Sequence, residues 1–250
     1  MDDSLKRPDE ETSAVQRVYR GILADLELGR MVPGQRLIET ELAGRFQVGR
    51  NAVREAIHRL EGRGVVDRSR HRSPAIRKLG QEETLDVLDV ADWMTALTLR
   101  AAASRYREDV HCQALQSALT LLEQAEQSDP IGAFSHARRN LYRVFLEIGG
   151  NRELQRLFPA IGMNIIYAQY QGIRLRRIRL TDYRRMIEAV QDGDADEATR
   201  VASEHVANVR SAIQEEWAAE GHEQGAASRR PAIAVYRPMI ERTSLRTRSS

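Results

Sequence analysis

The feature that most constrains this chain is a short segment whose basic and apolar residues separate onto opposite faces of a helix. With 3.6 residues per turn, one face of the segment 50–60 carries Arg50, Asn51, Arg54 and His58. The opposite face carries Val53, Ala56, Ile57 and Leu60. The apolar face predicts docking onto neighbouring helices. The polar face either binds an acidic partner or is the solvated surface of an ordinary helix.

Positive charge is concentrated around this segment. The formal net charge of the whole chain is only +2 at pH 7. Between Arg45 and Lys78, however, ten basic residues stand against three acidic ones. The nearly neutral chain therefore carries a strongly basic patch, which is typical of a region that binds nucleic acid.

The residues around the segment predict a helix-turn-helix. An apolar stripe from Val15 to Leu26 predicts a first helix, and short helices are expected over 39–46 and 50–61. In that layout the third helix enters the major groove with its N-terminal residues at the base edges. Arginine pairs there with guanine and asparagine with adenine, so Arg50, Asn51 and Arg54 are candidate base-reading residues.

A small hairpin is expected directly after these helices. Val65-Val66 and Ala75-Ile76 are short apolar pieces on either side of the basic run RSRHRSP. Such a hairpin would be the wing of a winged helix, and its basic tip would reach phosphates or the minor groove. His71 and Arg72 are the candidate contacts in this tip.

After Leu79 every strong pattern is helical. Helices are expected near 84–106, 109–128, 131–148, 151–178, 182–192 and 195–218. The first of them is apolar almost all round and is expected to be buried on several sides.

The expected fold class is mainly α, an N-terminal winged helix-turn-helix followed by an all-helical bundle of about six helices. The expected parts are a disordered N-terminus over 1–13, a DNA-binding domain over 14–79, a helical effector-binding and dimerisation domain over 80–220, and a basic flexible tail over 221–250.

The segment from Val18 to Arg77 resembles the DNA-binding domain of the GntR family of bacterial transcription regulators. Three motifs carry the resemblance: G-x-hydrophobic-x-P-G-x-x-L from Gly29, E-x-E-L-A from Glu39, and V-x-R-x-x-V-R-E-A-I-x-x-L-E-x-x-G from Val48. The resemblance implies that Arg50 and Arg54 contact operator DNA. It also places Thr40 where the second helix of family members often carries an arginine.

This chain departs from the family pattern beside the first arginine. Gly49 replaces the usual serine or threonine, and Asn51-Ala52 replaces the usual Thr-Pro. We therefore expect an operator sequence different from that of the best-known members.

Residues 80–218 resemble the FadR-type subgroup, whose C-terminal domain is called FCD. The G-G-N turn from Gly149 and the I-E-A-V-x-x-G-D-A run from Ile187 carry this resemblance. It implies a small effector, commonly an organic acid or an acyl derivative. In most members, one Asp and three His also hold a divalent metal.

At the four metal-ligand positions this chain has Arg138, Tyr142, Tyr183 and His205. No metal is expected, because a guanidinium repels a cation and a lone imidazole needs further ligands beside it. Arg138 is expected instead to attract an acidic effector directly. The alternative is that Arg138 forms a salt bridge with a nearby acid, the tyrosines pack, and His205 is a satisfied core histidine.

The leading hypothesis is a homodimeric, sequence-specific transcription regulator, a repressor by resemblance, whose operator affinity responds to an effector. No cofactor is expected. An enzyme is not expected, because no nucleotide-binding, P-loop, zinc-protease or nucleophile-elbow motif is present. The single cysteine, Cys112, and the lack of a signal peptide or long apolar run favour the cytoplasm. The rival is a DNA-binding dimer whose effector pocket has decayed, acting as an architectural or constitutive regulator.

Overall fold

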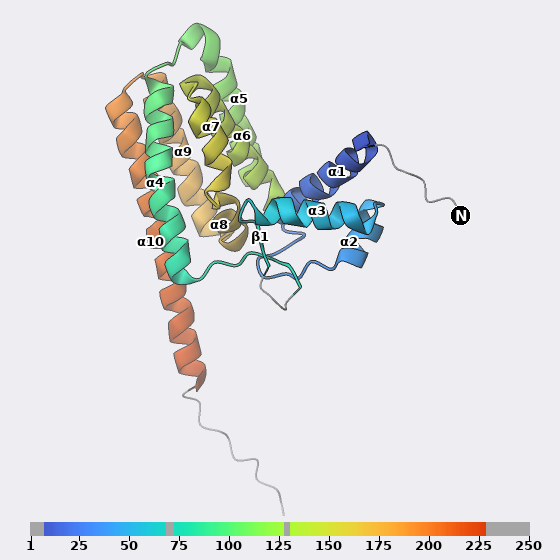
Figure 1. Cartoon of the computed structure of the whole chain (residues 1–250). Helices are drawn as coiled ribbons and strands as arrows, with labels where there is room; N and C mark the ends of the chain where they lie inside the picture. Colours follow the sequence, from blue (N-terminus) through green and yellow to red (C-terminus); the bar gives the residue numbers. More distant parts are fainter. Residues whose placement is uncertain (1–7, 69–72, 128–130, 229–250) are drawn as a thin grey trace, which may run out of the picture. The chain divides into compact units, whose positions relative to one another are not determined.

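The computed structural model describes residues 8–68, 73–127 and 131–228, and this part of the chain is mainly helical (Figure 1). It begins with α1 (Pro8–Glu27), α2 (Glu39–Phe46) and α3 (Arg50–Glu61). Helices α2 and α3 have the bounds that the sequence predicts. Gln47 follows α2 with a left-handed φ of 52°, which ends this helix and turns the chain toward α3.

The apolar faces of the first three helices form one core. Val53, Ala56, Ile57 and Leu60 of α3 are buried, as the sequence predicts. The stripe on α1 supplies Val18, Ile22 and Leu26 to the same core. Burying these side chains fixes the orientation of α3, so its polar face points to solvent.

A short wing follows α3. Strands β1 (Val66–Asp67) and β2 (Ala75–Ile76) pair antiparallel, with Val66 opposite Ile76. An additional bridge joins Arg36 to Ala75. The predicted hairpin is therefore confirmed, while its tip with His71 and Arg72 lies outside the described residues.

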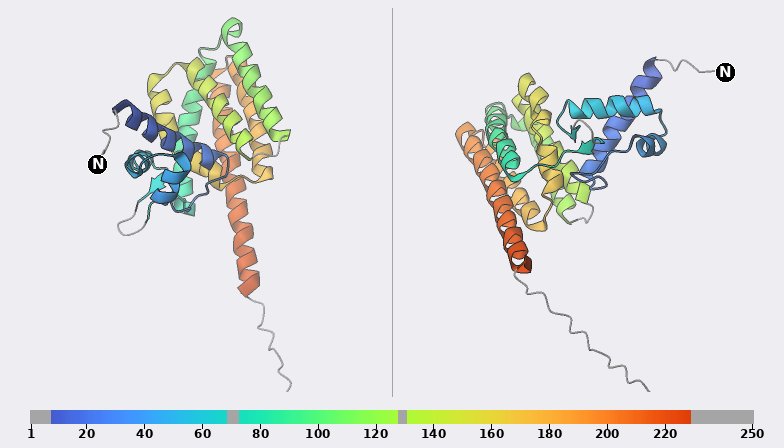
Figure 2. Two further views of the ribbon diagram at one scale, coloured as in Figure 1. Left: turned by 90° about the vertical axis from the view of Figure 1, so that its right-hand side faces the viewer. Right: turned by 60° about the horizontal axis from the view of Figure 1, so that its bottom comes forward.

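The remaining elements form a helical bundle. They are α4 (Gln81–Ala103), α5 (Glu108–Gln127), α6 (Ile131–Gly149), α7 (Arg152–Leu157), the 3-10 turn η1 (Phe158–Ala160), α8 (Met163–Gln169), α9 (Ile173–Gln191) and α10 (Ala195–Ser228). Leucines and aromatic residues from several of these helices share one core, including Leu99, Leu115 and Phe145. Helices α4 and α10 run side by side (Figures 1 and 2), joined by the ion pairs Asp89–Arg210 and Arg100–Asp196.

The single helix expected over 151–178 is wrong. The chain breaks there into α7, η1 and α8, and α9 begins at Ile173 rather than near 182. Pro159 and Gly162, whose φ is +76°, interrupt the helical path. The sequence pattern hid this break because apolar residues continue through it.

The expected burial of the first bundle helix on several sides is also wrong. One face of α4 is buried, including Leu88 and Leu99, but Trp93 is 80% exposed. Val90 and Leu97, at helical spacing from Trp93, are about half exposed. In the isolated chain, α4 therefore presents an apolar stripe to solvent.

The first and last described helices are longer than the sequence suggests. Helix α1 begins at Pro8, ahead of the expected start, and α10 continues past Gly221 to Ser228. Residues 1–213 form one unit and residues 214–250 a second, and of the second only the helix to Ser228 is described. No helix among the described residues is long and apolar enough to cross a membrane.

Candidate DNA-binding face and effector site

The polar face of α3 is an exposed surface whose two arginines share one carboxylate. Arg50, Asn51 and Arg54 are all exposed, and Thr40 is exposed on the neighbouring α2. Arg54 donates from Nε to Oε2 of Glu39 at 2.8 Å, and Nη2 of Arg50 lies 3.8 Å from the same oxygen. Glu39 therefore holds both guanidinium groups near the start of α3.

Three other arginines of the first three helices and the turn after them, Arg45, Arg59 and Arg63, also have partners there. Arg45 lies 2.6 Å from the buried carboxylate of Asp25, and Arg59 pairs with Glu55 on its own helix. The guanidinium carbon of Arg63 lies 5.7 Å from the ring centre of Tyr19. These contacts leave Arg50 and Arg54 as the pair on the outward face of α3.

The four positions singled out in the bundle do come together. The guanidinium carbon of Arg138 on α6 lies 5.9 Å from the ring centre of Tyr142. The Tyr142 ring meets Tyr183 of α9 edge-on at 6.0 Å, and Tyr183 lies 5.0 Å from the imidazole of His205 on α10. All four side chains are buried.

His205 is bound to a carboxylate that sequence reasoning missed. Its Nδ1 lies 3.0 Å from Oδ2 of Asp182, and the amide of Asn208 donates to Oδ1 of Asp182 at 3.1 Å. Burial lowers the pKa of His205, against the opposing effect of Asp182, so the imidazole is favoured in its neutral form. One ring nitrogen of His205 is thus satisfied within the core.

Arg179 and Tyr167 are two further members that the sequence pattern did not single out. The guanidinium carbons of Arg138 and Arg179 lie 3.4 Å and 4.3 Å from the centre of the Tyr167 ring. The alternative reading, a salt bridge of Arg138, is not found, since neither arginine pairs with an Asp or Glu among the described residues. The sequence prediction divided α9 between two helices and so missed Arg179. A single helix over this range would have placed Arg179 one turn before Asp182 and Tyr183, on the same buried face.

The pKa shifts in this cluster follow from burial and from the two arginines. Burial raises the pKa of Tyr142 and of Tyr183 well above the ordinary value. Burial acts the same way on Tyr167, but the adjoining Arg138 and Arg179 outweigh it and hold the pKa of that phenol below its ordinary value. Burial also lowers the pKa of Arg179 itself. The cluster is therefore a region of excess positive charge.

The cluster does not fit the divalent metal that the resemblance would imply. No group of three His, Cys, Asp or Glu side chains lies together anywhere in the described ranges. His205 and Asp182 are bound to each other, and Arg138 and Tyr142 supply no suitable ligand for a divalent ion. The chemistry of the donor set instead favours an anion.

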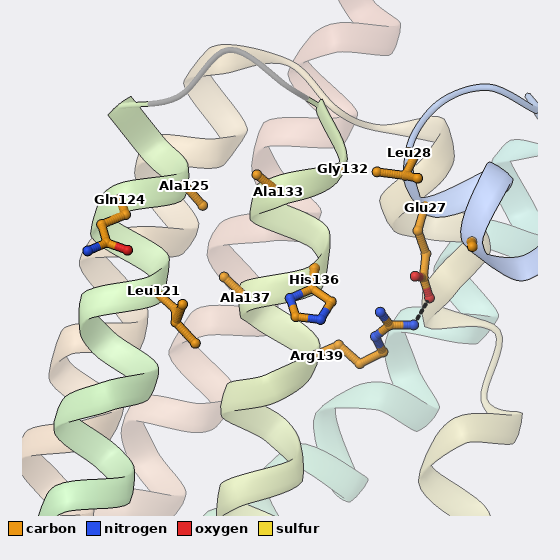
Figure 3. A pocket seen from close by; sticks show the side chains of 11 residues that line it. Glu27, Leu28, Leu121, Gln124, Ala125, Gly132, Ala133, His136, Ala137 and Arg139 are labelled. Carbon is orange, nitrogen blue, oxygen red and sulfur yellow. Dashed lines mark hydrogen bonds and ion pairs between the residues drawn. The ribbon is translucent and has the colours of Figure 1, made fainter.

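Two cavities lie near these helices. A cavity of about 510 Å³ reaches Arg138 and Tyr142. Its lining is mixed, because the apolar Leu146 and Phe158 share it with the carboxylates of Glu27 and Glu147. A second, of about 610 Å³, lies between the end of α1 and helices α5 and α6 (Figure 3). In the second, Arg139 is already paired with Glu27, and small apolar residues dominate. Of these two cavities, only the first reaches Arg138.

Comparison with known families agrees with this arrangement. The family model described as "Bacterial regulatory proteins, gntR family" matches residues 14–76, and the model of the FCD domain matches residues 86–208. The two matches cover the helix-turn-helix with its wing and most of the helical bundle.

Individual relatives are distant but extend over most of the chain. One is the "Probable D-xylose utilization operon transcriptional repressor" of Paenarthrobacter nicotinovorans, which is 23% identical over 83% of this chain and 91% of its own length. The "HTH-type transcriptional repressor RspR" of Escherichia coli K12 is 21% identical over 80% of this chain and 89% of its own length. The solved structure of McbR/YncC from E. coli matches with a TM-score of 0.70 at 17% identity, over 82% of this chain and 98% of that one. The likeness to this structure concerns the fold.

Proposed function

Because the chain belongs to the GntR family of bacterial transcription regulators and carries an FCD domain, we propose that it acts in the cytoplasm as a homodimeric repressor. The outward face of α3 reads the operator. A small organic acid or acyl derivative bound in the bundle changes the affinity for that operator. No catalytic role is assigned to any residue.

One observation carries the DNA-binding part of the proposal. The core of the first three helices orients α3 so that Arg50, Asn51 and Arg54 face outward together, beside Thr40 on α2. Two guanidinium groups and an amide at the start of an exposed helix suit the major groove. His71 and Arg72 remain candidate contacts from the wing.

The DNA part is tested by fluorescence anisotropy with DNA from upstream of the gene and with a scrambled duplex of equal length and composition. We expect clearly tighter binding to the natural sequence at moderate salt. Equal affinity for the two duplexes would instead support an architectural role. In this assay the test variant is Arg54→Ala and the matched control is Arg59→Ala. Arg59 is also exposed on α3, but it pairs with Glu55 of the same helix.

The effector part rests on buried charge. Arg138, 8% exposed, has no carboxylate partner among the described residues, although burying an unpaired charge is costly. Its guanidinium lies against the rings of Tyr142 and Tyr167. Tyr183 and His205 follow next to Tyr142 in the same core. An acidic ligand would supply the missing negative charge.

A decayed pocket is the second candidate, and a specific observation supports it. Tyr183 is completely buried and packs against Phe134, Tyr142 and His205, so it fills space in which other members could hold a ligand. Native mass spectrometry of the purified protein separates the two candidates. A small acid retained by each subunit supports the effector site, and an unliganded dimer that ignores added acids supports the decayed one.

The exposed stripe on α4 supports dimerisation. Val90, Trp93 and Leu97 present contiguous apolar surface, and a second copy of the chain would cover it. A dimer also matches the two half-sites that a helix-turn-helix protein needs for specificity. By size-exclusion chromatography with light scattering, Trp93→Glu should give monomers. Ile173→Glu, which changes another exposed apolar residue, should leave the dimer intact.

A further inference from the structure

A short segment, residues 77–80, joins the wing to the bundle and is called the linker below. Strand β2 ends at Ile76 and α4 begins at Gln81, so no longer connection separates them. A segment this short has little slack when its backbone is held in place. Its conformation therefore helps to set how the DNA-binding helices are held with respect to α4.

One side chain of the bundle holds the backbone of the linker. Gln169, the last residue of α8, accepts at Oε1 from the backbone N–H of Leu79 at 3.1 Å. Its Nε2 donates to the backbone oxygen of Leu79 at 2.9 Å. A single amide thus pairs with both polar groups of one residue, as a neighbouring strand does in an antiparallel sheet. Leu79 is 3% exposed, so these bonds replace water that has little access to the backbone.

The amide of Gln169 is itself fixed by its neighbours. Nε2 also donates to the phenol oxygen of Tyr170 at 3.1 Å, and this oxygen lies 3.4 Å from Oγ1 of Thr84 in the first turn of α4. The backbone oxygen of Tyr170 accepts from Arg179 of α9 at 3.1 Å. Tyr170 and Thr84 are both buried. A network that connects α4, α8 and α9 therefore keeps the amide in the orientation that Leu79 requires.

The other end of the linker is attached to the wing and to α4. The backbone N–H of Arg77 donates to the oxygen of Val65 at 2.9 Å, and its guanidinium donates to the oxygen of Gly64 at 3.4 Å. The same guanidinium pairs with Glu83 in the first turns of α4. With Arg77 and Leu79 both held, the linker acts as a stiff connection and not as a flexible tether.

A second contact between the DNA-binding helices and the bundle is more exposed. Glu27 of α1 pairs with Arg139 of α6, whose side chain is 49% exposed. Water and salt screen such a pair, so it holds the contact only weakly. The buried bonds between Gln169 and Leu79 are therefore the stiffer of these two attachments.

A stiff linker has a consequence for a dimer that reads two half-sites. Each base pair added between half-sites moves one of them by about 3.4 Å and turns it by about 34° around the duplex. Two rigidly held copies of α3 can both bind at one spacing, and a shifted spacing lets only one of them bind well. Flexible connections would bridge several spacings with similar affinity.

We propose that Gln169 is a positioning residue for operator recognition. By holding Leu79, it keeps the linker stiff and makes the protein select operators by the spacing of their half-sites. The proposal rests on the homodimeric regulator function proposed above. It adds a residue that determines specificity from the bundle, without touching DNA.

The test compares operators of different spacing. The operator is first located by nuclease footprinting in the DNA upstream of the gene. Duplexes are then made with one or two base pairs added or removed at its centre, together with a duplex that carries a single half-site. Binding of the full-length protein is measured by fluorescence anisotropy. We expect the wild type to prefer the natural spacing clearly.

Gln169→Met keeps the length of the side chain and removes both bonds to Leu79. The ratio of affinities for natural and shifted spacing should fall at least about fivefold. Affinity for the single half-site should stay unchanged, because α3 is not altered. Hydrogen exchange of the linker, followed by mass spectrometry, should become faster.

The matched control is Gln155→Met. Gln155 also donates to a backbone oxygen, that of Leu146, but both residues belong to the bundle. This variant should keep the spacing preference and the linker exchange of the wild type. If Gln169→Met does not fold, Tyr170→Phe is measured in its place. It removes the phenol that holds the amide and should change the spacing preference in the same direction.

The proposal is wrong if the wild type binds its operator specifically but accepts every spacing equally. It is also wrong if Gln169→Met keeps the full spacing preference, or weakens all duplexes and the single half-site by the same factor. In these cases specific operator binding by the wild type would leave the regulator function intact. A wild type that binds no upstream DNA specifically would overturn the regulator function, and this proposal with it.

Discussion

Arginine is used in two opposite ways in this molecule. On α3, Arg50 and Arg54 are exposed, and both lie beside Glu39, whose side chain is 21% exposed. In the bundle, Arg138 and Arg179 lie in the core and have no acidic partner among the described residues. Water solvates and screens the exposed pair, so its charges cost little free energy. The buried pair has lost its hydration, so its charges are unfavourable for stability.

This difference suggests two different sources of binding free energy, one for the proposed DNA-binding face and one for the proposed effector site. The exposed arginines are available for DNA because losing water and Glu39 costs little. The buried arginines already carry the cost of desolvation in the unliganded protein, so a ligand that supplies negative charge relieves it. In the proposed function, the exposed arginines attract DNA through long-range electrostatics. The buried arginines would instead bind an anion because their charge has no carboxylate partner.

The sharpest test of the comparison changes a carboxylate to its amide in the buried region. Asp182→Asn leaves donors of His205 or Asn208 facing an amide, and it removes the buried negative charge of Asp182. We expect the free energy of unfolding to fall by about 3 kcal/mol. Urea denaturation followed by circular dichroism measures this change. A loss below about 1 kcal/mol would mean that the cluster is well hydrated.

The next effect concerns DNA rather than stability. Arg54→Ala should weaken operator binding by about 1–3 kcal/mol and relax the base preference, with stability nearly unchanged. Anisotropy titrations on operator and scrambled duplexes measure both quantities. Equal losses on the two duplexes would show that Arg54 contacts phosphate and does not read a base.

A pH titration probes the buried region again. His205 has a lowered pKa in the folded protein, so below the ordinary value of about 6.5 the unfolded chain binds the extra proton. The free energy of unfolding should therefore fall as the pH drops through this range. Asp182, Arg138, Arg179 and Tyr183 face the imidazole, and only Asp182 opposes the effect.

His205→Gln should flatten this pH dependence, and His58→Gln at an exposed site should not. Thermal melts between pH 5.5 and 7.5 compare the slopes, over a window set by the ordinary histidine value of about 6.5. An unchanged slope in His205→Gln would mean that the pKa of His205 is the same in the folded and the unfolded protein.

The smallest effect is expected from the matching change in the exposed region. Glu39→Gln removes the carboxylate beside Arg50 and Arg54, and stability should change by less than about 1 kcal/mol. Affinity for DNA should rise by up to about fivefold, because a negative charge near the phosphates is lost. A large loss of stability would show that the ion pairs of Glu39 with Arg50 and Arg54 contribute substantially to folding, contrary to this expectation.

Much of the fold could be predicted where local pattern and packing agree. The bounds of α2 and α3 and the buried face of α3 follow from helical spacing. The wing strands follow from two short apolar pieces on either side of a basic segment. The break at Pro159 and Gly162 could not be placed, since apolar residues continue across it. The exposure of Trp93 could not be predicted either, because a helix that is apolar on several sides does not reveal which side faces the core.

The sequence by itself determined the helical architecture and the basic outward face of α3, because both follow from residue type and from helical spacing. Arg138, Tyr142 and Tyr183 were singled out only by the resemblance to the FCD subgroup. Only the tertiary structure decided which charges are paired, because Arg45 meets Asp25 and His205 meets Asp182 across different helices. It also brought Arg179 and Tyr167 to Arg138. Such contacts depend on how helices pack, and packing is set by the whole core rather than by any one segment.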